Sequence, residues 1–314
     1  MIAYTLRRVV GVVPVLVLVA LGSFLLVHLV PGDPAMVMLG SEATPQQIQS
    51  LRTQMGLDQS LPEQFVRWTR EVLHGNLGDS FFLGRPVAQA LLERLPATMQ
   101  LALLSLLFSL LVGIPAGIVA AVRQNTWWDQ AVMVTAMGGI SIPSFWLGLA
   151  LILVFSVGLG WLPSGGYTPL SENLWQGLRS LVLPAVSLGF MQAALIARMT
   201  RSSMLEVLRL DYVRTAKAKG LRWRRVTLRH ALKNAMIPVI TTIGTAFGVL
   251  LGGAVIVEIV FTYPGLGRLV VLAVQRRDYP LVQGALLLTS VIYVAVNLGV
   301  DLLYSIFDPR ITYE

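Results

Sequence analysis

The segment DYVRTAKAKGLRWRRVTLRHALKNAMIP, Asp211–Pro238, decides the fold because it is a strongly basic island inside a very apolar chain. It holds eight Arg and Lys residues against a single acid, Asp211. Each such cation costs roughly 2.5–3.5 kcal/mol at the centre of a bilayer, so eight would cost on the order of 20 kcal/mol. The island is therefore predicted to lie in water or at a headgroup surface, between segments that cross the membrane.

The spacing within the island predicts two short helices that lie on the membrane face and join at Gly220, since glycine adopts backbone angles that other residues resist. Two stripes recur at helical spacing: the cations Arg222, Arg225, Arg229 and Lys233, and the apolar residues Leu221, Leu228, Leu232 and Ala235. A solvated positive-inside loop that only sets topology is the alternative interpretation. Nucleic-acid binding is disfavoured, because apolar spans flank the segment and no aromatic platform for single strands is visible.

The composition indicates an integral membrane protein. Of 314 residues, 55% are hydrophobic and only 13% are charged, whereas soluble domains carry about 25% charged residues. The absence of cysteine excludes disulfides, thiol nucleophiles and cysteine metal sites, and the three histidines lie far apart in the sequence. No P-loop pattern occurs, so any ATP that powers the protein must be hydrolysed by another chain.

Apolar runs long enough for a hydrocarbon core of about 30 Å predict an all-α protein with six transmembrane helices. The predicted spans are Val9–Val30, Pro96–Val122, Ala131–Gly158, Leu181–Arg198, Ala235–Glu258 and Leu281–Phe307. Three parts follow: residues 1–30 with the first span, an extracytoplasmic subdomain at 31–96, and a core transmembrane domain at 97–314 that contains the basic loop 199–236.

The distribution of Lys and Arg predicts the orientation. Six spans place both termini on one side, and that side carries 15 Lys and Arg residues against 9 on the other. Because these residues favour the cytoplasm, both termini and the basic island are expected to be cytoplasmic.

Within 31–96, a short helix from Pro45 to about Asp58 and an amphipathic helix Leu61–His74 are predicted. This subdomain either contacts a partner or acts as a lid over the helix ends.

The sequence of the island resembles that of the cytoplasmic loop of inner-membrane permease subunits of bacterial ABC importers. That loop carries the motif E-A-A, then three residues, G, nine residues and I-x-L-P. In this chain, the triplet Arg214-Thr215-Ala216 aligns with E-A-A, and Gly220 aligns with the glycine. The I, L and P positions are occupied by His230, Leu232 and Lys233. Gly220 and Leu232 match, whereas the Glu and the Pro are absent. YVRTAKAKG…HALKNAMIP is similar to the dipeptide/oligopeptide branch, as are PGDP, TYPGLGR…RRDYP and the C-terminal NLGVDLLYSIFDPRI, so the resemblance covers essentially the whole chain.

The resemblance implies a permease subunit of an ATP-driven importer, taking up di- or oligopeptides, or a related solute such as glutathione or a nickel chelate, across the bacterial inner membrane. Its implied partners are a second homologous permease, two cytoplasmic ATPase subunits that carry ATP and Mg, and an extracytoplasmic solute-binding protein, in contact with membrane lipid. No cofactor or catalytic residue is expected in this chain. The residues implied in coupling to an ATPase subunit are Tyr212, Arg214, Thr215, Ala216, Lys217, Ala218, Lys219 and Gly220, with the small residues permitting close docking.

Three other function classes stay open at this point. An ion-coupled secondary transporter usually needs a carboxylate near the midplane, and the two ionisable residues within spans, Glu258 and Asp301, lie near the span ends. An integral membrane enzyme would need a His, Asp or Glu cluster, and a purely structural scaffold would show no solute flux.

Two glycine pairs in the predicted spans, Gly113-x-x-x-Gly117 and Gly244-x-x-x-Gly248, have the spacing for close helix packing or for lining a translocation path.

Overall fold

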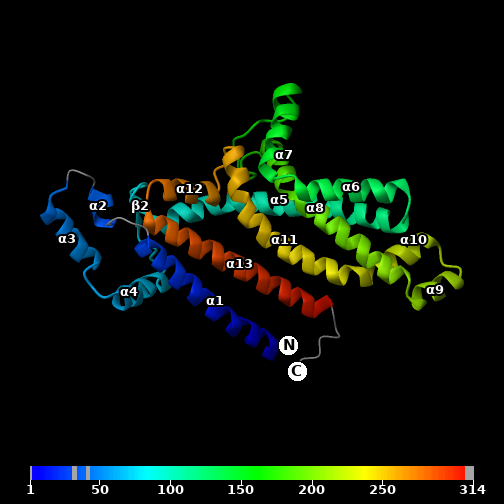
Figure 1. The fold of residues 1–314 in the computed structure, drawn as a ribbon, viewed down its shortest axis with the longest axis horizontal. Helices are drawn as coiled ribbons and strands as arrows, with labels where there is room; N and C mark the ends of the chain where they lie inside the picture. Colours follow the sequence, from blue (N-terminus) through cyan, green and yellow to red (C-terminus); the bar gives the residue numbers. More distant parts are fainter. Residues whose placement is uncertain (1, 30–33, 40–42, 308–314) are drawn as a thin grey trace. The chain divides into compact units, whose positions relative to one another are not determined.

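The structure is a computed structural model that describes the backbone of residues 2–29, 34–39 and 43–307, and most of it is helical (Figure 1). The long helices are α1 (Ile2–Leu29), α5 (Val87–Val122), α6 (Trp127–Ser141), α8 (Leu174–Leu208), α11 (Leu232–Val260) and α13 (Tyr279–Phe307). The shorter elements are α2 (Pro34–Leu39), α3 (Pro45–Met55), α4 (Leu61–Leu73), α7 (Ser144–Leu151), α9 (Asp211–Ala218), α10 (Trp223–Arg225), α12 (Leu266–Gln275), the π-helical segments η1 (Ile152–Gly158) and η2 (Val226–Ala231), and the strands β1 (Asp79–Ser80) and β2 (Arg85–Pro86).

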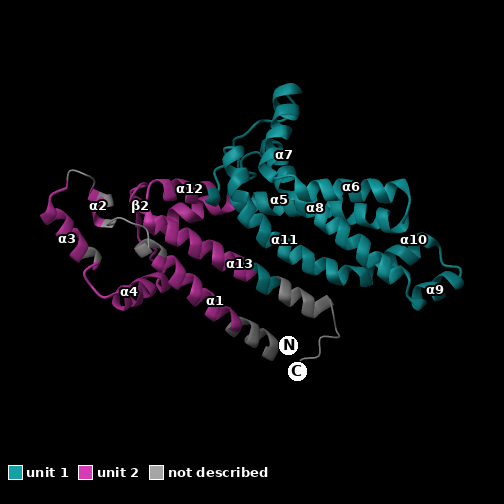
Figure 2. Ribbon diagram, in the orientation of Figure 1, with its two compact units in different colours: residues 1, 97–267, 296–314 teal, residues 2–96, 268–295 magenta. Residues whose placement is uncertain are grey.

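The chain divides into two compact units, which Figure 2 colours separately. Unit 1 holds residues 97–267 and 296–314, and unit 2 holds residues 2–96 and 268–295. The break between residues 96 and 97 coincides with the predicted start of the core transmembrane domain. The segment 268–295, which the sequence places in that domain, belongs to unit 2.

Helices α5, α8 and α11 build the core of unit 1. Their buried apolar side chains form one cluster, which includes Leu101, Leu181, Leu250 and Val257. Glycines let α5 and α8 approach closely. A Cβ at Gly113 would lie 2.6 Å from the backbone oxygen of Ala193 in α8, and a Cβ at Gly117 would lie 2.5 Å from that of Ala197, one turn further along α8. The packing role predicted for this glycine pair is therefore the one that the structure shows.

The predicted third span is not one straight helix. Helix α6 ends at Ser141, and the pair Trp127–Ser141 and Ser144–Gly158 is bent by 106°. Pro143 explains the break, since proline lacks an N–H and disfavours helical angles at the residue before it. Ile142 accordingly takes extended angles, φ −85° and ψ 120°.

Four helices among the described residues are long and apolar enough to cross a membrane, and five if the bent pair forms one span. They are Val87–Val122, Leu174–Leu208, Trp223–Val260 and Tyr279–Gly299. The fourth and fifth predicted spans are thus parts of longer helices. In the predicted first span, the part with described side chains, Gly11–Leu25, forms an apolar helix with one polar residue, Ser23.

Unit 2 is held together by aromatic packing and one buried acid. Phe24 of α1 packs edge-on against Phe65 of α4, with ring centroids 5.3 Å apart. The buried Asp278 accepts a 2.6 Å hydrogen bond from the Ser80 hydroxyl and a 3.0 Å bond from the Phe82 backbone N–H. This carboxylate ties the β1–β2 hairpin to the turn before α13.

The two helices predicted within 31–96 are confirmed as α3 and α4, and their ends have local causes. Thr44 and Gln47 form a capping box at the start of α3, and Ser60 and Glu63 form one at the start of α4. The Ser60 hydrogen bonds lower the pKa of the Glu63 carboxyl below its usual value. Helix α3 ends at Gly56, which has the left-handed φ of 62°.

Candidate functional site

The segment predicted to couple to an ATPase subunit is helix α9 with its C-terminal turn. Asp211 lies in the first turn, where a negative charge complements the helix dipole. At the other end, the Gly220 N–H donates to the Lys217 carbonyl at 2.9 Å and the Leu221 N–H donates to the Ala216 carbonyl at 3.4 Å. This bond pattern is a Schellman motif, and it needs the left-handed φ of 75° that Gly220 adopts.

The inner face of α9 packs against the chain itself. Val213, Ala216 and Val226 form a buried cluster. Val207 and Leu208, at the end of α8, pack against it together with the turn that follows α9. Helix α9 is therefore packed against the ends of two helices, α8 and the helix that begins at Trp223, which are both long enough to span a membrane.

A polar contact adds to this attachment. The Asn234 side-chain amide in α11 donates a 2.7 Å hydrogen bond to the Tyr212 hydroxyl. That hydroxyl in turn donates to the backbone carbonyl of His230 at 3.3 Å. Tyr212 therefore links α9 to the first turn of α11 while its side chain stays partly exposed.

The outer face of α9 carries exposed basic side chains. Arg214 makes only a long 3.5 Å ion pair with Asp211, and both side chains are largely exposed, so this pair contributes little. Lys217 lies 4.1 Å from the ring centre of Trp223, a cation–π contact that holds the ammonium beside the turn. Lys219 and Ala218 are exposed next to it.

Seven of the eight predicted site residues lie at the surface: Tyr212, Arg214, Thr215, Lys217, Ala218, Lys219 and Gly220. Ala216 does not; it is only 8% exposed and belongs to the inner cluster. Its small side chain thus permits close packing within this chain rather than at an outer surface. The Thr215 hydroxyl donates to the Asp211 carbonyl at 2.9 Å, one turn earlier in the same helix.

The second predicted helix of the island differs in two respects. It is not separate, because α10 continues through the π-helical segment η2 into α11, and the whole forms one helix from Trp223 to Val260. Its buried face also agrees only in part with the predicted apolar stripe: Ala235 is buried, whereas Leu228 is 44% exposed. Leu228 lies in the π-helical segment, whose turn is longer than that of an α-helix, and Val226, Thr227 and Ala231 are the buried residues there.

Sequence reasoning missed several residues that position this site. Val213 anchors α9, Trp223 holds Lys217, and Asn234 binds Tyr212. A signal existed for Val213, because it and Ala216 stand three residues apart in an otherwise polar helix. Trp223 and Asn234 had no such signal, since their contacts depend on how the chain turns at Gly220.

A buried ion pair was also missed. Asp129, in the first turn of α6, accepts two hydrogen bonds from the Arg201 guanidinium of α8, at 2.5 and 2.7 Å. It accepts a third from the Asn125 backbone N–H at 3.0 Å. The fork of bonds fixes the start of α6 against α8.

Glu258, one of the two ionisable candidates within predicted spans, has a structural position. It is fully buried near the end of α11 and accepts a 2.6 Å hydrogen bond from the Thr98 hydroxyl of α5. The Leu266 backbone N–H donates to the same hydroxyl at 2.8 Å, so the group joins α5 to both ends of the loop between α11 and α12. The side chain of the other candidate, Asp301, lies outside the described residues.

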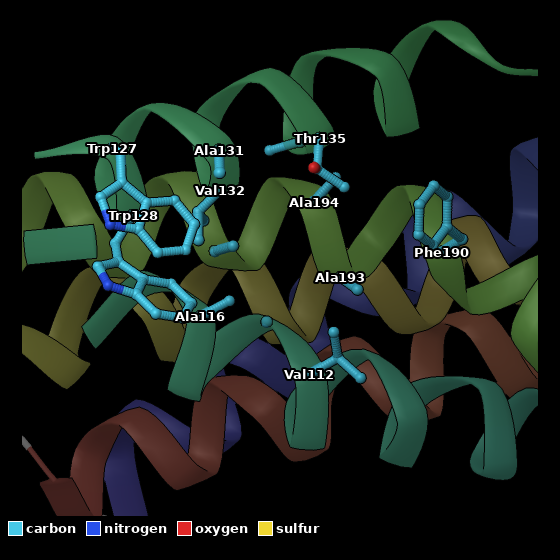
Figure 3. Close-up of a pocket in the computed structure, with 13 residues that line it drawn as sticks. Val112, Ala116, Trp127, Trp128, Ala131, Val132, Thr135, Phe190, Ala193 and Ala194 are labelled. Carbon is cyan, nitrogen blue, oxygen red and sulfur yellow. The ribbon is translucent and has the colours of Figure 1, made fainter. Parts of the chain in front are cut away.

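An apolar groove lies between α5, α6 and α8, with a volume of about 250 Å³ (Figure 3). Figure 3 shows Trp127 and Trp128 at one end, beside Ala116, and Phe190 at the other end. The two indole rings stack with centroids 3.8 Å apart. Its lining includes no charged side chain, so the groove has no group to hold the charged ends of a peptide.

Two family models together match nearly the whole chain. The model described as "Binding-protein-dependent transport system inner membrane component" matches residues 113–313. The model for the N-terminal part of such membrane components matches residues 1–102.

Similar proteins carry transport names. The chain is 46% identical over 314 residues to a putative peptide transport system permease of Brucella abortus and to the glutathione transport system permease GsiC of Escherichia coli, covering all of both chains. It is 41% identical over 333 residues to the dipeptide transport system permease DppB of Alkalihalophilus pseudofirmus, again covering the whole of each.

Solved structures show the same fold. A chain of the MetNI methionine ABC transporter in an inward-facing conformation matches with a TM-score of 0.58 and 20% identity, covering 70% of this chain and 97% of that one. A chain of an amino acid ABC transporter matches with a TM-score of 0.50 and 16% identity, covering 71% and 94%. The chain belongs to the binding-protein-dependent transport system inner-membrane components, and it is a multi-pass ABC importer permease of the peptide branch.

Proposed function

We propose that this permease forms the translocation pathway for di- or oligopeptides, with glutathione as the alternative solute. The names of the relatives support both, because the peptide and the glutathione permeases are equally similar to this chain, at 46% identity. Family membership supports an importer of this kind over an ion-coupled secondary transporter. The expected assembly contains a second permease, two cytoplasmic ATPase subunits that bind ATP and Mg, and an extracytoplasmic binding protein.

We further propose six membrane crossings with both termini in the cytoplasm. The crossings are α1, α5, the bent segment from α6 to η1, α8, the helix from Trp223 to Val260, and α13. Residues 1–30 then hold the first crossing, residues 31–96 form an extracytoplasmic subdomain, and residues 97–314 form the core. The surplus of Lys and Arg in the island around α9 supports a cytoplasmic position for it.

Helix α9 is the proposed coupling helix, and one observation carries this assignment. Its inner face is buried against α8 and η2, while its outer face presents Arg214, Lys217 and Lys219 to solvent. A groove on an ATPase subunit that holds the outer face would pull on both membrane helices when ATP binds. Tyr212, Thr215, Ala218 and Gly220 border that face, and Ala216 transmits the force from inside.

Substituting Gly220 tests the coupling. A Cβ at Gly220 would meet no atom within 4 Å, so Gly220→Val acts through the left-handed φ of 75° and not through a clash. A β-branched residue there is strongly disfavoured, so the C-terminal turn of α9 with Lys217 and Lys219 must move. We expect the assembled importer to keep hydrolysing ATP while solute uptake into vesicles falls about tenfold or more, as a strain of 1–3 kcal/mol permits.

The matched control is Gly84→Val in the β1–β2 turn, where φ is 63° and the space is equally open. It introduces the same strain far along the chain from α9 and should leave the ratio of uptake to hydrolysis unchanged. Normal coupled uptake in Gly220→Val, or equal uncoupling in both variants, would refute the role of α9.

A further inference from the structure

We propose that a pocket at the start of the helix leading into α11 binds the phosphate headgroup of an anionic membrane phospholipid. This arginine pocket has a volume of about 650 Å³. Its lining combines four guanidinium groups with two aliphatic side chains and the backbone of Gly220: Arg222, Arg224, Arg225, Arg229, Leu221, Leu228 and Gly220.

The four arginines of the pocket have no acidic partner among the residues that the structure describes. Other arginines do: Arg85 pairs with Glu93 at 2.8 Å, and Arg201 pairs with Asp129. Four like charges around one depression repel one another, and a bound anion relieves that repulsion. Guanidinium forks match the geometry of a phosphate, which they bind with paired hydrogen bonds.

The end of the pocket nearest the apolar span lies at the depth of the headgroup layer. Arg229 precedes Ala235, where the apolar run begins, by six residues, which is about 9 Å of helix. The headgroup region adds about 5–7 Å on each side of the hydrocarbon. The Arg229 side chain is long enough to cover the difference between this depth and the roughly 9 Å of helix that separate it from Ala235. The placement requires only that the helix from Trp223 to Val260 crosses a membrane.

The apolar residues of the pocket favour a lipid over a free anion or a protein. Leu228 is 44% exposed beside the arginines, and Trp223 is 42% exposed at the same turn. Such a combination suits the boundary between a phosphate and the glycerol and acyl groups of one lipid, and tryptophan is enriched at that depth. An acidic surface of an ATPase subunit is the competing occupant, because Gly220 both lines the pocket and borders the outer face of α9; the arginines themselves lie beyond that face, on the turn and helix that follow α9.

The test compares lipid retention in variants of the full-length chain. The chain is incorporated into phosphatidylcholine vesicles with and without phosphatidylglycerol, extracted in mild detergent, and weighed with its bound lipid by native mass spectrometry. In R222Q/R225Q/R229Q we expect the affinity for phosphatidylglycerol to fall about 100-fold, since each basic residue contributes about 1 kcal/mol, or about fivefold. The control R123Q/R198Q/R209Q removes three exposed arginines elsewhere in unit 1 and should stay within a few-fold of the native chain.

Several outcomes would overturn the proposal. Equal losses in both triple variants would assign lipid binding to diffuse charge. Unchanged retention in R222Q/R225Q/R229Q, together with loss of the ATPase subunits when the same variant is purified as part of the whole importer, would assign the pocket to protein contact. Thermal stabilisation of the lipid-free chain by inorganic phosphate, equal to that by phosphatidylglycerol, would assign it to free phosphate.

A second variant covers the case in which the glutamine variant aggregates. R222K/R225K/R229K keeps the charge but loses the planar fork, and we expect it to bind phosphatidylglycerol about tenfold more weakly than the native chain. Native affinity in the lysine variant would refute arginine-specific phosphate binding.

Discussion

Replacing Asp129 by asparagine isolates the buried ion pair that joins α6 to α8. Asp129 is 3% exposed, and its carboxylate receives both hydrogen bonds of the Arg201 fork. Removing one partner of a buried pair costs 3–5 kcal/mol, because the other charge stays desolvated. The Arg201 side chain is 24% exposed and can reach water in part, so we expect the low end, about 3 kcal/mol of unfolding free energy.

The assay is reversible unfolding of the full-length chain in mixed micelles, with Asp211→Asn as the control. The Asp211 side chain is 94% exposed and its pair with Arg214 is 3.5 Å long, so its loss should cost less than about 0.5 kcal/mol. A double-mutant cycle with Arg201→Gln completes the measurement, and we expect a coupling energy of about 2 kcal/mol. Additive single effects, or equal effects of Asp129→Asn and Asp211→Asn, would refute the assignment of this pair as a clamp.

Two further predictions concern packing and pH. Gly117→Leu should destabilise the chain by about 1–3 kcal/mol in the same assay, because a Cβ there would lie 2.5 Å from a backbone oxygen of α8. The control Gly138→Leu should not destabilise the chain, because a Cβ at Gly138 meets nothing within 4 Å. Equal effects of the two substitutions would contradict the close approach of α5 and α8 at Gly117. Ser60→Ala should raise the pKa of Glu63, because the Ser60 hydrogen bonds lower it. The contribution of Glu63 to α4 is present above its ordinary pKa and is lost as the pH falls through the lowered folded value; a carbon NMR titration that shows the same Glu63 pKa in native and variant chains would contradict this.

The long apolar helices were predictable from the sequence because their energetics are local. Each residue of an apolar run contributes its own transfer free energy, so the helices long enough to span a membrane could be expected without knowledge of their neighbours. The same holds for the basic island and for α3 and α4, whose starts depend on residues three positions apart. Gly220 was predictable as a junction because only its backbone angles mattered.

The site itself was only partly predictable. The sequence indicated which residues form the segment proposed for coupling, but it did not separate Ala216 and Val213, which face inward, from Lys217 and Lys219, which face outward. The exposure of Leu228 within the predicted apolar stripe has a local cause as well. Leu228 lies in a π-helical segment, where the turn is longer than the α-helical turn that the stripe assumes.

By itself, the sequence determined that this chain is a helical membrane protein and where its basic island lies, because insertion energies sum residue by residue along the chain. Only the tertiary structure decided the pairs that hold unit 1 together, Asp129 with Arg201 and Thr98 with Glu258. These partners stand 72 and 160 positions apart, and their energy exists only once helices that are distant in sequence have become neighbours.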